Sequence, residues 1–414
     1  MTEDGILARR LGLRDAVVIG LGSTIGAGVF AAFAPAADAA GSALLLALAV
    51  AAVVAYANAM SSARLAAMYP ESGGTYVYGR ERLGPFWGYL AGWGFVVGKT
   101  ASCAAMALTV GYYAAPQYAA LVGAVAVAVL TGLNYTGVQK SATVTRVIVV
   151  FVLLTLTAVV AGAALGSTPA DQGLVVLDGV GVAGTLQGAA FLFFAFAGYA
   201  RIATLGEEVR DPARTIPRAI PVALGIALAV YAAVAVALLA VLGPAGIAET
   251  SAPLAAAAEV SGWAWLDPLV RVGAVVAAVG SLLSLLLGVS RTTLAMARDG
   301  HLPRTLAAVH PRYQVPHHAE LAVGALVIVA VLVADVRSAI GFSSFAVLAY
   351  YAIANASALT VRPTAGSVIV PTVGLIGCVA LAASLPPAST VAGIAVLTLG
   401  GLIWALRRRL ATTQ

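Results

Sequence analysis

The chain has 414 residues, of which 61% are hydrophobic and only 10% carry a charged side chain. Soluble domains are about half apolar and about a quarter charged, so this composition excludes an ordinary soluble domain. The apolar content also excludes a disordered chain, in spite of 44 glycines. We therefore expect a membrane protein. The two cysteines, Cys103 and Cys378, are too few for a disulfide framework or a thiolate metal site.

Long apolar runs follow one another along the whole chain. A helix needs about 20 apolar residues to cross the hydrocarbon core, and the runs predict an all-α membrane protein with about 12 transmembrane helices. The candidate spans, in chain order, are 14–38, 42–67, 85–113, 117–136, 143–165, 182–205, 216–243, 266–296, 319–334, 340–360, 366–384 and 388–406. The first run follows Arg9, Arg10 and Arg14, and we expect it to be retained as a span rather than cleaved as a signal peptide.

Basic residues are concentrated in alternate connections between these spans. Because cytoplasmic loops retain lysine and arginine, this distribution predicts the orientation. The connections expected in the cytoplasm carry Arg80, Arg82, Lys140, Arg210, Arg214, Arg298, Arg304, Arg312, Arg407, Arg408 and Arg409. The opposite connections 166–181 and 243–267 carry none, and only Arg337 departs from the pattern. Both termini are therefore expected in the cytoplasm and the chain in the inner (plasma) membrane, and the net charge of +6 requires no nucleic-acid partner.

Two of the predicted spans contain segments that disfavour a continuous helix. Residues 19–30, in the first span, read IGLGSTIGAGVF. Each glycine inside a helix costs roughly 1 kcal/mol relative to alanine, so this glycine-rich segment at mid-membrane predicts an unwound stretch. Residues 193–201, in the sixth span, read FFAFAGYAR, which places a glycine and a cation at the same depth.

The two interrupted spans occupy matching places in two halves of the chain. Five spans separate Gly26 from Gly198, and because five is odd, the second five-helix unit is expected to enter the membrane from the opposite side. We predict inverted repeats over 1–165 and 182–360, followed by two extra helices in 366–414. Paired interrupted helices of this kind point to the substrate site of a transporter. The alternative is that these glycines only allow close helix packing.

Unwinding would free backbone N–H and C=O groups at membrane depth. Such groups are tolerated there only if they line a cavity or bind a ligand. Free N–H groups at a half-helix N-terminus suit a carboxylate, and free carbonyls suit an ammonium. One zwitterion would therefore satisfy both sets.

Three segments carry a family resemblance when taken together. Residues 22–30 read GSTIGAGVF, residues 206–217 read GEEVRDPARTIP, and residues 290–303 read SRTTLAMARDGHLP. In this order, and with residues 193–198 at the sixth-span break, they resemble the amino acid/polyamine/organocation superfamily of transporters over nearly the whole chain. The resemblance implies a LeuT-like fold, with two inverted five-helix repeats and two extra helices, and alternating access around a central site.

The resemblance also implies site residues. In such transporters the amides of the first-helix break hold the substrate carboxylate, carbonyls of both breaks receive the ammonium, and an aromatic side chain at the sixth-helix break covers the substrate. We expect helices three, six and ten to form the side-chain pocket. The expected substrate-binding residues are Ser23, Thr24, Gly26, Ala27, Gly28, Ser102, Phe194, Phe196, Ala197, Gly198, Arg201 and Tyr350, with Phe194 or Phe196 as the cover.

Lys99 lies near the middle of the third span, where a lysine costs about 2.5 to 3.5 kcal/mol on insertion scales and is expected to face the bundle interior. Some proton-coupled family members use a fifth-helix lysine in place of a sodium ion, but Val152 stands at that place here. Lys99 either replaces that amine from another helix or is a structural cation. Sodium-binding relatives use helix-eight hydroxyls, which match Ser281 and Ser284, and Ile25 completes the expected coupling set. The alternative for each serine is a bond back to its own helix.

Arg201 is unexpected at the sixth-helix break, because many relatives carry an acidic residue where this chain has Ala200. Three roles are open for it. It recognises an acidic side chain of the substrate, closes a cytoplasmic gate with Glu207 or Glu208, or forms a structural ion pair.

These patterns together predict a secondary active transporter, an amino acid permease with proton-coupled uptake. Amino acid or amine exchange and polyamine transport are alternatives within the fold, and a channel is a more distant one. We do not expect an enzyme, because His301, His310, His317 and His318 do not make a metal site by themselves and no catalytic motif stands in a suitable context. We expect no cofactor, a proton as coupling ion with sodium left open, a small amino acid or amine as substrate, the lipid bilayer as surroundings, and no obligatory protein partner.

Overall fold

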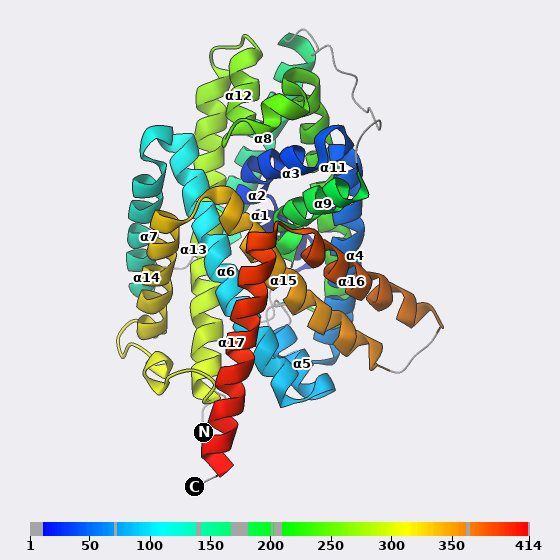
Figure 1. Ribbon diagram of the computed structural model, residues 1–414. Coiled ribbons are helices and arrows are strands. Elements are labelled where there is room, and N and C mark those ends of the chain that lie inside the picture. The colour runs from blue at the N-terminus through cyan, green and yellow to red at the C-terminus, as the bar shows by residue number, and fades with distance from the viewer. Residues whose placement is uncertain are drawn as a thin grey trace.

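The structure, a computed structural model, describes residues 11–69, 73–137, 142–166, 181–199, 202, 209–361 and 365–412. Apart from one β-bridge between Leu11 and Val209, the elements within these ranges are helices (Figure 1). They are α1 (Leu13–Thr24), α2 (Ala27–Ala31), α3 (Phe33–Ala40), α4 (Leu44–Met68), α5 (Thr75–Leu83), α6 (Pro85–Ala114), α7 (Ala119–Tyr135), α8 (Ala142–Gly166), α9 (Val182–Phe196), α11 (Pro212–Ala248), α12 (Pro253–Val260), α13 (Leu266–Arg298), α14 (His317–Val333), α15 (Val336–Leu359), α16 (Ala365–Ser384) and α17 (Pro387–Thr412). The 3₁₀ turns are η1 (Gly41–Ala43), η2 (Pro116–Tyr118), η3 (Ala197–Tyr199) and η4 (Arg304–Ala307).

Within the described ranges, 10 helical segments are long and apolar enough to cross a membrane. The all-helical membrane class is therefore confirmed. At the predicted ninth and eleventh spans, α14 and the segment Val368–Ser384 of α16 are apolar but shorter. The count of twelve spans and the inverted repeat stay predictions. Two helices were not predicted: α5 lies in the connection after the second span, and α12 lies in the connection before the eighth.

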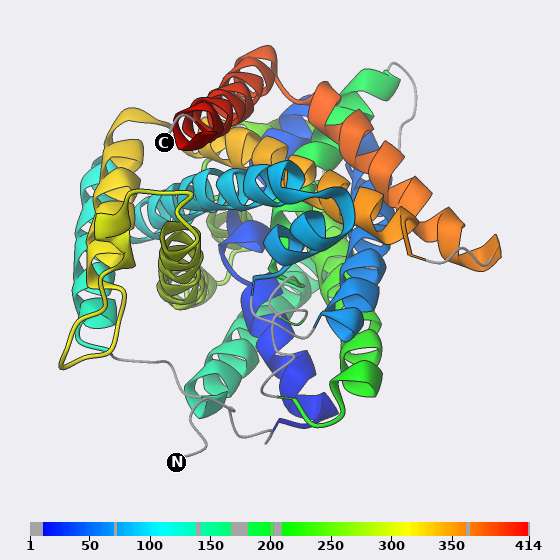
Figure 2. The same ribbon diagram turned by 90° about the horizontal axis from the view of Figure 1, so that it is seen from below.

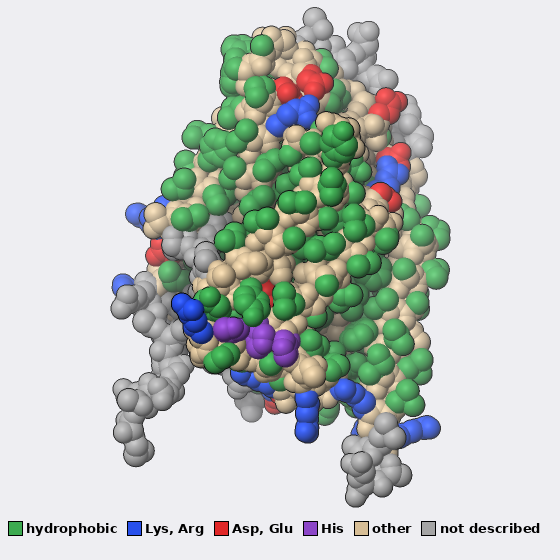
Figure 3. All heavy atoms as spheres, turned by 90° about the vertical axis from the view of Figure 1, so that its left-hand side faces the viewer, with side chains coloured by type: hydrophobic (Ala, Val, Ile, Leu, Met, Phe, Trp, Pro, Cys, Tyr) green, Lys and Arg blue, Asp and Glu red, His purple; other side chains and the backbone are tan. Residues whose placement is uncertain are grey.

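The outer helices present apolar stripes to the surroundings. α7 exposes Leu121, Val125 and Val129, and α14 exposes Leu326 and Val329, three or four residues apart and so on one face of each helix. Figure 3 looks onto this side, where hydrophobic side chains cover most of the middle and histidine and basic side chains gather toward the lower end. A continuous apolar surface of this kind suits a protein surrounded by lipid.

The centre of the bundle is built on α6, which packs mainly against α15 and α13. Small residues allow the close approach. A Cβ on Gly98 would lie 2.6 Å from Cβ of Ala346, and a Cβ on Gly123 would lie 2.8 Å from the carbonyl oxygen of Ala107. Helices in lipid gain no hydrophobic driving force from meeting each other, so packing through small residues is what holds them together.

The two ends of the bundle differ in charge. The end drawn at the bottom of Figure 1 carries α5, η4 and the last turn of α17, and we call it the basic end. Its arginines include Arg80, Arg82, Arg298, Arg304, Arg407, Arg408 and Arg409. On the opposite side of the molecule Arg271 pairs with Glu259 at 2.8 Å, and Arg337, the exception to the predicted charge pattern, pairs with Asp38 at 2.7 Å.

Candidate functional site

The first predicted interruption is present as a break between two helices. α1 ends at Thr24 and α2 begins at Ala27. Ile25 has φ −83° and ψ 65°, and Gly26 has φ −112° and ψ −141°, so both residues leave the helical region. No side chain caps α2, and the first amides of a helix have no partner within it. These amides are therefore available to another group.

The second predicted interruption lies where α9 gives way to η3. Gly198, in η3, packs directly on the first break, because a Cβ there would overlap the carbonyl oxygen of Ser23 and lie 2.6 Å from Cα of Thr24. Gly28 meets Ala195 just as closely. Only a residue without a side chain permits such an approach. Close packing and helix interruption are thus both present here, at the same glycines.

Tyr231 of α11 joins the two breaks. Its buried hydroxyl group donates to the carbonyl oxygen of Thr24, at 2.6 Å, and approaches that of Ala195 at 3.1 Å. One acceptor belongs to each break. Sequence reasoning missed this residue, although it is the only side chain with a polar group between positions 222 and 242.

A cavity of about 270 Å³ lies beside the contact between the two breaks. Residues of α1, α2, α5, α6, α9, η3, α13 and α15 line it. From the predicted substrate-binding set, the structure places Ser23, Thr24, Gly26, Ala27, Gly28, Ser102, Phe194, Ala197, Gly198 and Tyr350 at its wall, and from the predicted coupling set Lys99, Ser281 and Ser284. Segments far apart in sequence, from Ser23 to Tyr350, therefore meet around one space.

Two expected residues are not at this wall, and a third lies outside the described residues. Phe196 is fully buried behind it, with its ring 5.1 Å from the ring of Tyr231, so Phe194 is the aromatic side chain that faces the cavity. Ile25 is buried at the break and does not line the cavity. Arg201 lies outside the described residues, as do Glu207 and Glu208, its suggested gate partners.

The cavity also has lining residues that sequence reasoning missed. They are Gly73, Gly74, Tyr76, Phe95, Met106, Ala195, Leu285, Gly288, Arg291 and Thr292. A signal for several of them was available, because positions 95, 99, 102 and 106 share one face of α6, and positions 281, 284, 288 and 292 share one face of α13. Extending Lys99 and Ser281 by helical spacing would have found them.

Lys99 has no hydrogen bond or ion pair to any described residue, although it is only 7% exposed. Its ammonium group is therefore not held by a static partner in the described part of the chain. The two serines of α13 do bond back to their own helix, Ser281 to the carbonyl oxygen of Ala277 at 2.9 Å and Ser284 to that of Gly280 at 3.1 Å. Each serine keeps its oxygen lone pairs for another partner.

α5 forms the wall of the cavity toward the basic end. The amide of Thr75 donates to the hydroxyl oxygen of Tyr350 at 3.0 Å. The hydroxyl group of Tyr76 donates to Asp299 and lies 2.9 Å from Nδ1 of His301. Arg80 approaches the same Asp299 carboxylate at 3.6 Å. These contacts tie α5 to the segment that follows α13.

Burial sets the protonation of this group of side chains. It raises the pKa of Tyr76, and the hydrogen bond to Asp299 raises it further. Burial lowers the pKa of His301, and the charges of Arg407 and Arg80 lower it too, against the opposing charge of Asp299. The neutral forms of Tyr76 and His301 are therefore favoured.

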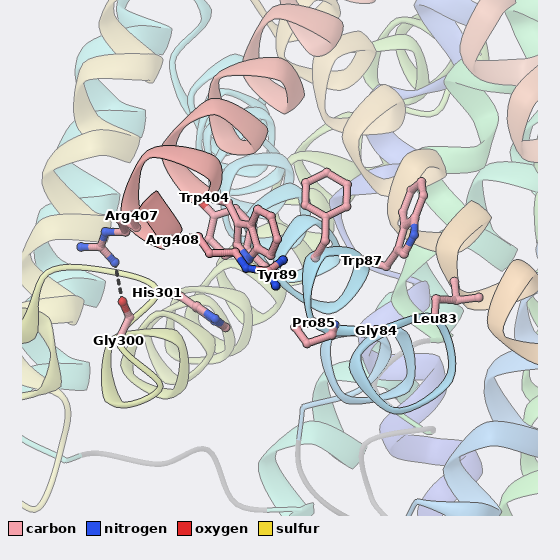
Figure 4. Close-up of a pocket in the computed structure, with 11 residues that line it drawn as sticks. Leu83, Gly84, Pro85, Trp87, Tyr89, Gly300, His301, Trp404, Arg407 and Arg408 are labelled. Carbon is pink, nitrogen blue, oxygen red and sulfur yellow. Dashed lines mark hydrogen bonds between the residues drawn. The ribbon is translucent and has the colours of Figure 1, made fainter. Parts of the chain in front are cut away.

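A second cavity, of about 540 Å³, lies at the basic end between the start of α6 and the last turns of α17. Figure 4 shows Trp87 at the right, and Tyr89 beside Trp404 and Arg408, with Arg407 further to the left. None of the residues of the two breaks lines it. The central cavity is therefore the candidate site.

Three histidine rings near the basic end pack against one another, edge to face or tilted. The ring of His317 lies 5.3 Å from that of His310 and 4.2 Å from that of His318. Among the described residues, no group of three or more histidine, cysteine, aspartate or glutamate side chains is arranged to hold a metal ion.

Comparison with known proteins identifies the family. A family model described as "Amino acid permease" matches residues 15–399. The chain is 68% identical over 405 residues to "Uncharacterized transporter Rv1999c" of Mycobacterium tuberculosis, which covers 97% of this chain and 92% of that protein. It is 27% identical over 335 residues to "Branched-chain amino acid permease BcaP" of Bacillus subtilis, with 75% of this chain and 72% of that protein covered. It is 29% identical over 389 residues to "Cationic amino acid transporter 4" of Homo sapiens, with 87% of this chain and 61% of that protein covered. This chain is a multi-pass membrane protein, and it belongs to the amino acid permease family of the amino acid/polyamine/organocation superfamily.

Proposed function

We propose that this protein is a secondary active amino acid transporter that works by alternating access, with the central cavity as its substrate site. The observation that carries the proposal is the direct contact of two helix breaks beside that cavity. Broken helices at membrane depth offer backbone donors and acceptors to a ligand. The amides of 26–28 hold the substrate carboxylate, and carbonyl groups near Ser23 and Phe194 receive its ammonium.

The charge of the cavity favours one class of side chain. The charged residues at its wall, among the described residues, are Lys99 and Arg291, and both are cations. A lysine or arginine side chain of a substrate would be repelled, whereas Phe95, Met106 and Leu285 provide apolar contact. We therefore propose neutral, apolar amino acids as substrates. This agrees with the name of the branched-chain relative rather than with that of the cationic one.

The arginines of the basic end and the buried Lys99 support a direction of transport and a coupling ion. The basic end is proposed to face the cytoplasm, because cytoplasmic segments retain arginine. Both termini then lie in the cytoplasm of a cell whose plasma membrane holds the protein, and transport runs inward. Lys99, which has no partner at the cavity wall among the described residues, is proposed as a proton-coupling residue of this uptake.

Counterflow in proteoliposomes tests the transport function. Vesicles loaded with unlabelled leucine are expected to take up labelled leucine transiently, with saturation, and excess isoleucine or valine should compete. Excess arginine or a polyamine should not compete. Currents that do not saturate would instead identify a channel, and uptake of arginine or polyamine in preference to leucine would contradict the proposed substrate class.

A further inference from the structure

A buried carboxyl group lies on α14, away from the wall of the central cavity. Glu320 is only 1% exposed, and neither oxygen of its side chain has a hydrogen-bond partner among the described residues. A buried ion without a partner is strongly unfavourable, so proteins either pair such a group or keep it neutral. The surroundings of Glu320 therefore decide its charge.

These surroundings follow from how α7 and α14 pack side by side, as Figures 1 and 2 both show. The end of α7 meets the start of α14, where the rings of Tyr135 and His317 lie 6.1 Å apart. Two turns into α14, Gly324 packs on the side chain of Thr131. The helices therefore run antiparallel, and the residues between these two contacts face each other.

Glu320 lies between these contacts, together with Asn134 of α7 and Ser290 of α13. We call the four residues Thr131, Asn134, Ser290 and Glu320 the Glu320 cluster. All four are buried, with exposed fractions of 6%, 2%, 0% and 1%.

Two hydrogen-bond donors of this cluster are used elsewhere. Ser290 donates its hydroxyl proton to the carbonyl oxygen of Leu286 at 2.9 Å, and the amide of Asn134 donates to that of Leu283 at 3.3 Å. The carbonyl oxygen of the Asn134 side chain has no partner, nor has the hydroxyl group of Thr131. The donors that remain are the hydroxyl proton of Thr131 and the second N–H of Asn134, and they face the two oxygens of Glu320 and the oxygens of Asn134 and Thr131. Oxygen acceptors therefore outnumber the remaining donors, and a proton on Glu320 would supply one more donor.

Few charges act on the cluster. In the described ranges no ion pair reaches Glu320. The charged and titratable groups around it include Arg291 on α13, Cys103 on α6, and His317 one turn earlier on its own helix. α7 contributes Tyr135 at its end, and η4 contributes the exposed Arg304. None of these side chains is placed to neutralise the carboxylate by direct contact.

Two of these neighbours connect the cluster to the transport site. Arg291 lines the central cavity, and its charge acts on Glu320. Cys103 lies one helical turn beyond Lys99 on α6, within electrostatic reach of both Lys99 and Glu320. A change of charge on Glu320 would therefore alter the electrostatic potential at Arg291, a residue of the cavity wall.

We propose that Glu320 is a second proton-binding residue of the transport cycle. It holds a proton on its carboxyl group while the Glu320 cluster is buried, as it is in this structure. The proton comes from water on one side of the membrane and leaves to water on the other, and the carboxyl group returns to its starting form. This inference rests on the proposed transport function and adds to it a site outside the substrate cavity.

The test separates exchange from accumulation in proteoliposomes. Glu320→Gln is expected to keep leucine counterflow, which needs no gradient, and to lower accumulation driven by an imposed pH difference about tenfold, a usual size for coupling between sites. Glu249→Gln, an exposed residue outside the cavity and the cluster, serves as the matched control and should behave as wild type. Loss of counterflow in the wild-type protein would contradict the transport function itself, whereas unchanged accumulation by Glu320→Gln would overturn the inference alone.

Infrared spectroscopy reads the proton directly and does not depend on transport. The wild-type protein at neutral pH should show the C=O band of a protonated, buried carboxylic acid, and Glu320→Gln should lack it. Glu320→Asp keeps a carboxyl group and should show a shifted band, which guards against a Gln variant that fails to fold. The inference is wrong if this band is absent from the wild type. It is also wrong if the difference in accumulation between wild type and Glu320→Gln depends on replacing sodium with choline rather than on changing the pH.

Discussion

The central cavity and the Glu320 cluster are two buried polar regions on different sides of α13, and they are built in different ways. At the cavity the polar groups come largely from the backbone, because two helices break and meet through Gly198 and Gly28. In the cluster α7, α13 and α14 remain continuous, and the polarity comes from side chains alone. Broken helices offer donors and acceptors together, as a zwitterion requires, whereas the cluster offers an excess of acceptors, as a proton requires.

The two regions share one property. Lys99 at the cavity and Glu320 in the cluster are both buried, and neither forms an ion pair with a described residue. A permanent bond between them would make both charges structural. Because neither charge has a partner among the described residues, each can respond to substrate or proton.

The largest effect is expected where the two breaks touch. Gly198→Val places a side chain on the backbone of Ser23 and Thr24, so the breaks must separate. We expect leucine counterflow to be lost and stability to fall by about 1–3 kcal/mol or more, the usual cost of overpacking. Gly225→Val is the matched control, because nothing lies within 4 Å of the position of its Cβ. Counterflow assays and thermal unfolding of both variants measure the two expected effects. Normal counterflow by Gly198→Val would show that the contact between the breaks is dispensable.

Lys99→Ala tests the role of the buried charge at the cavity, as Glu320→Gln tests that of the buried charge in the cluster. Accumulation driven by a pH difference should be abolished while counterflow remains, because the cavity keeps its backbone groups and loses only the ammonium. The variant should also be more stable, since a buried lysine costs about 2.5 to 3.5 kcal/mol in a membrane. Unchanged dependence on pH would leave Lys99 with a structural role only.

Tyr231→Phe tests the bond that joins the breaks. It removes the hydroxyl group shared by the carbonyl oxygens of Thr24 and Ala195, and a buried acceptor left without a donor costs about 1–3 kcal/mol. We expect lower thermal stability and slower counterflow with the same dependence on pH as wild type. Tyr56→Phe, at an exposed position, is the control. Equal stability of the two variants would argue against a joining role for Tyr231.

A smaller, pH-dependent effect is expected at the basic end. Because the pKa of His301 is lowered in the folded protein, the unfolded chain binds more protons as the pH falls through about 6.5, the ordinary histidine value, and stability falls with it. Above that pH the effect is absent. His301→Gln should flatten this part of the dependence of the unfolding temperature on pH relative to wild type. A slope of His301→Gln identical to that of wild type would contradict the role of His301.

The smallest effect is expected far from both regions. Arg337→Gln removes an exposed ion pair with Asp38, and such pairs contribute about 0–1 kcal/mol. Neither transport nor its dependence on pH should change. A large loss of transport in this variant would mean that the contact between α3 and α15 takes part in the cycle.

Local sequence determined the helical class, the approximate helix bounds and the positions of both breaks. Apolar length, glycine content and the order of short motifs are properties of neighbouring residues, so the chain itself reveals them. The family followed from the same motifs, and the comparisons confirmed it. α5 and α12 were missed, because short helices outside the apolar runs have no such signal.

Only the tertiary structure decided which helix faces meet. That Gly198 packs on Ser23, that Tyr231 bonds to both breaks, and that Glu320 lies opposite Asn134 depends on the rotation and register of helices joined through long stretches of chain. An apolar helix in lipid has many faces of similar composition, and helical periodicity alone does not say which one a partner covers. The sequence therefore predicted where the membrane helices break, and the fold decided what those breaks and the buried charges face.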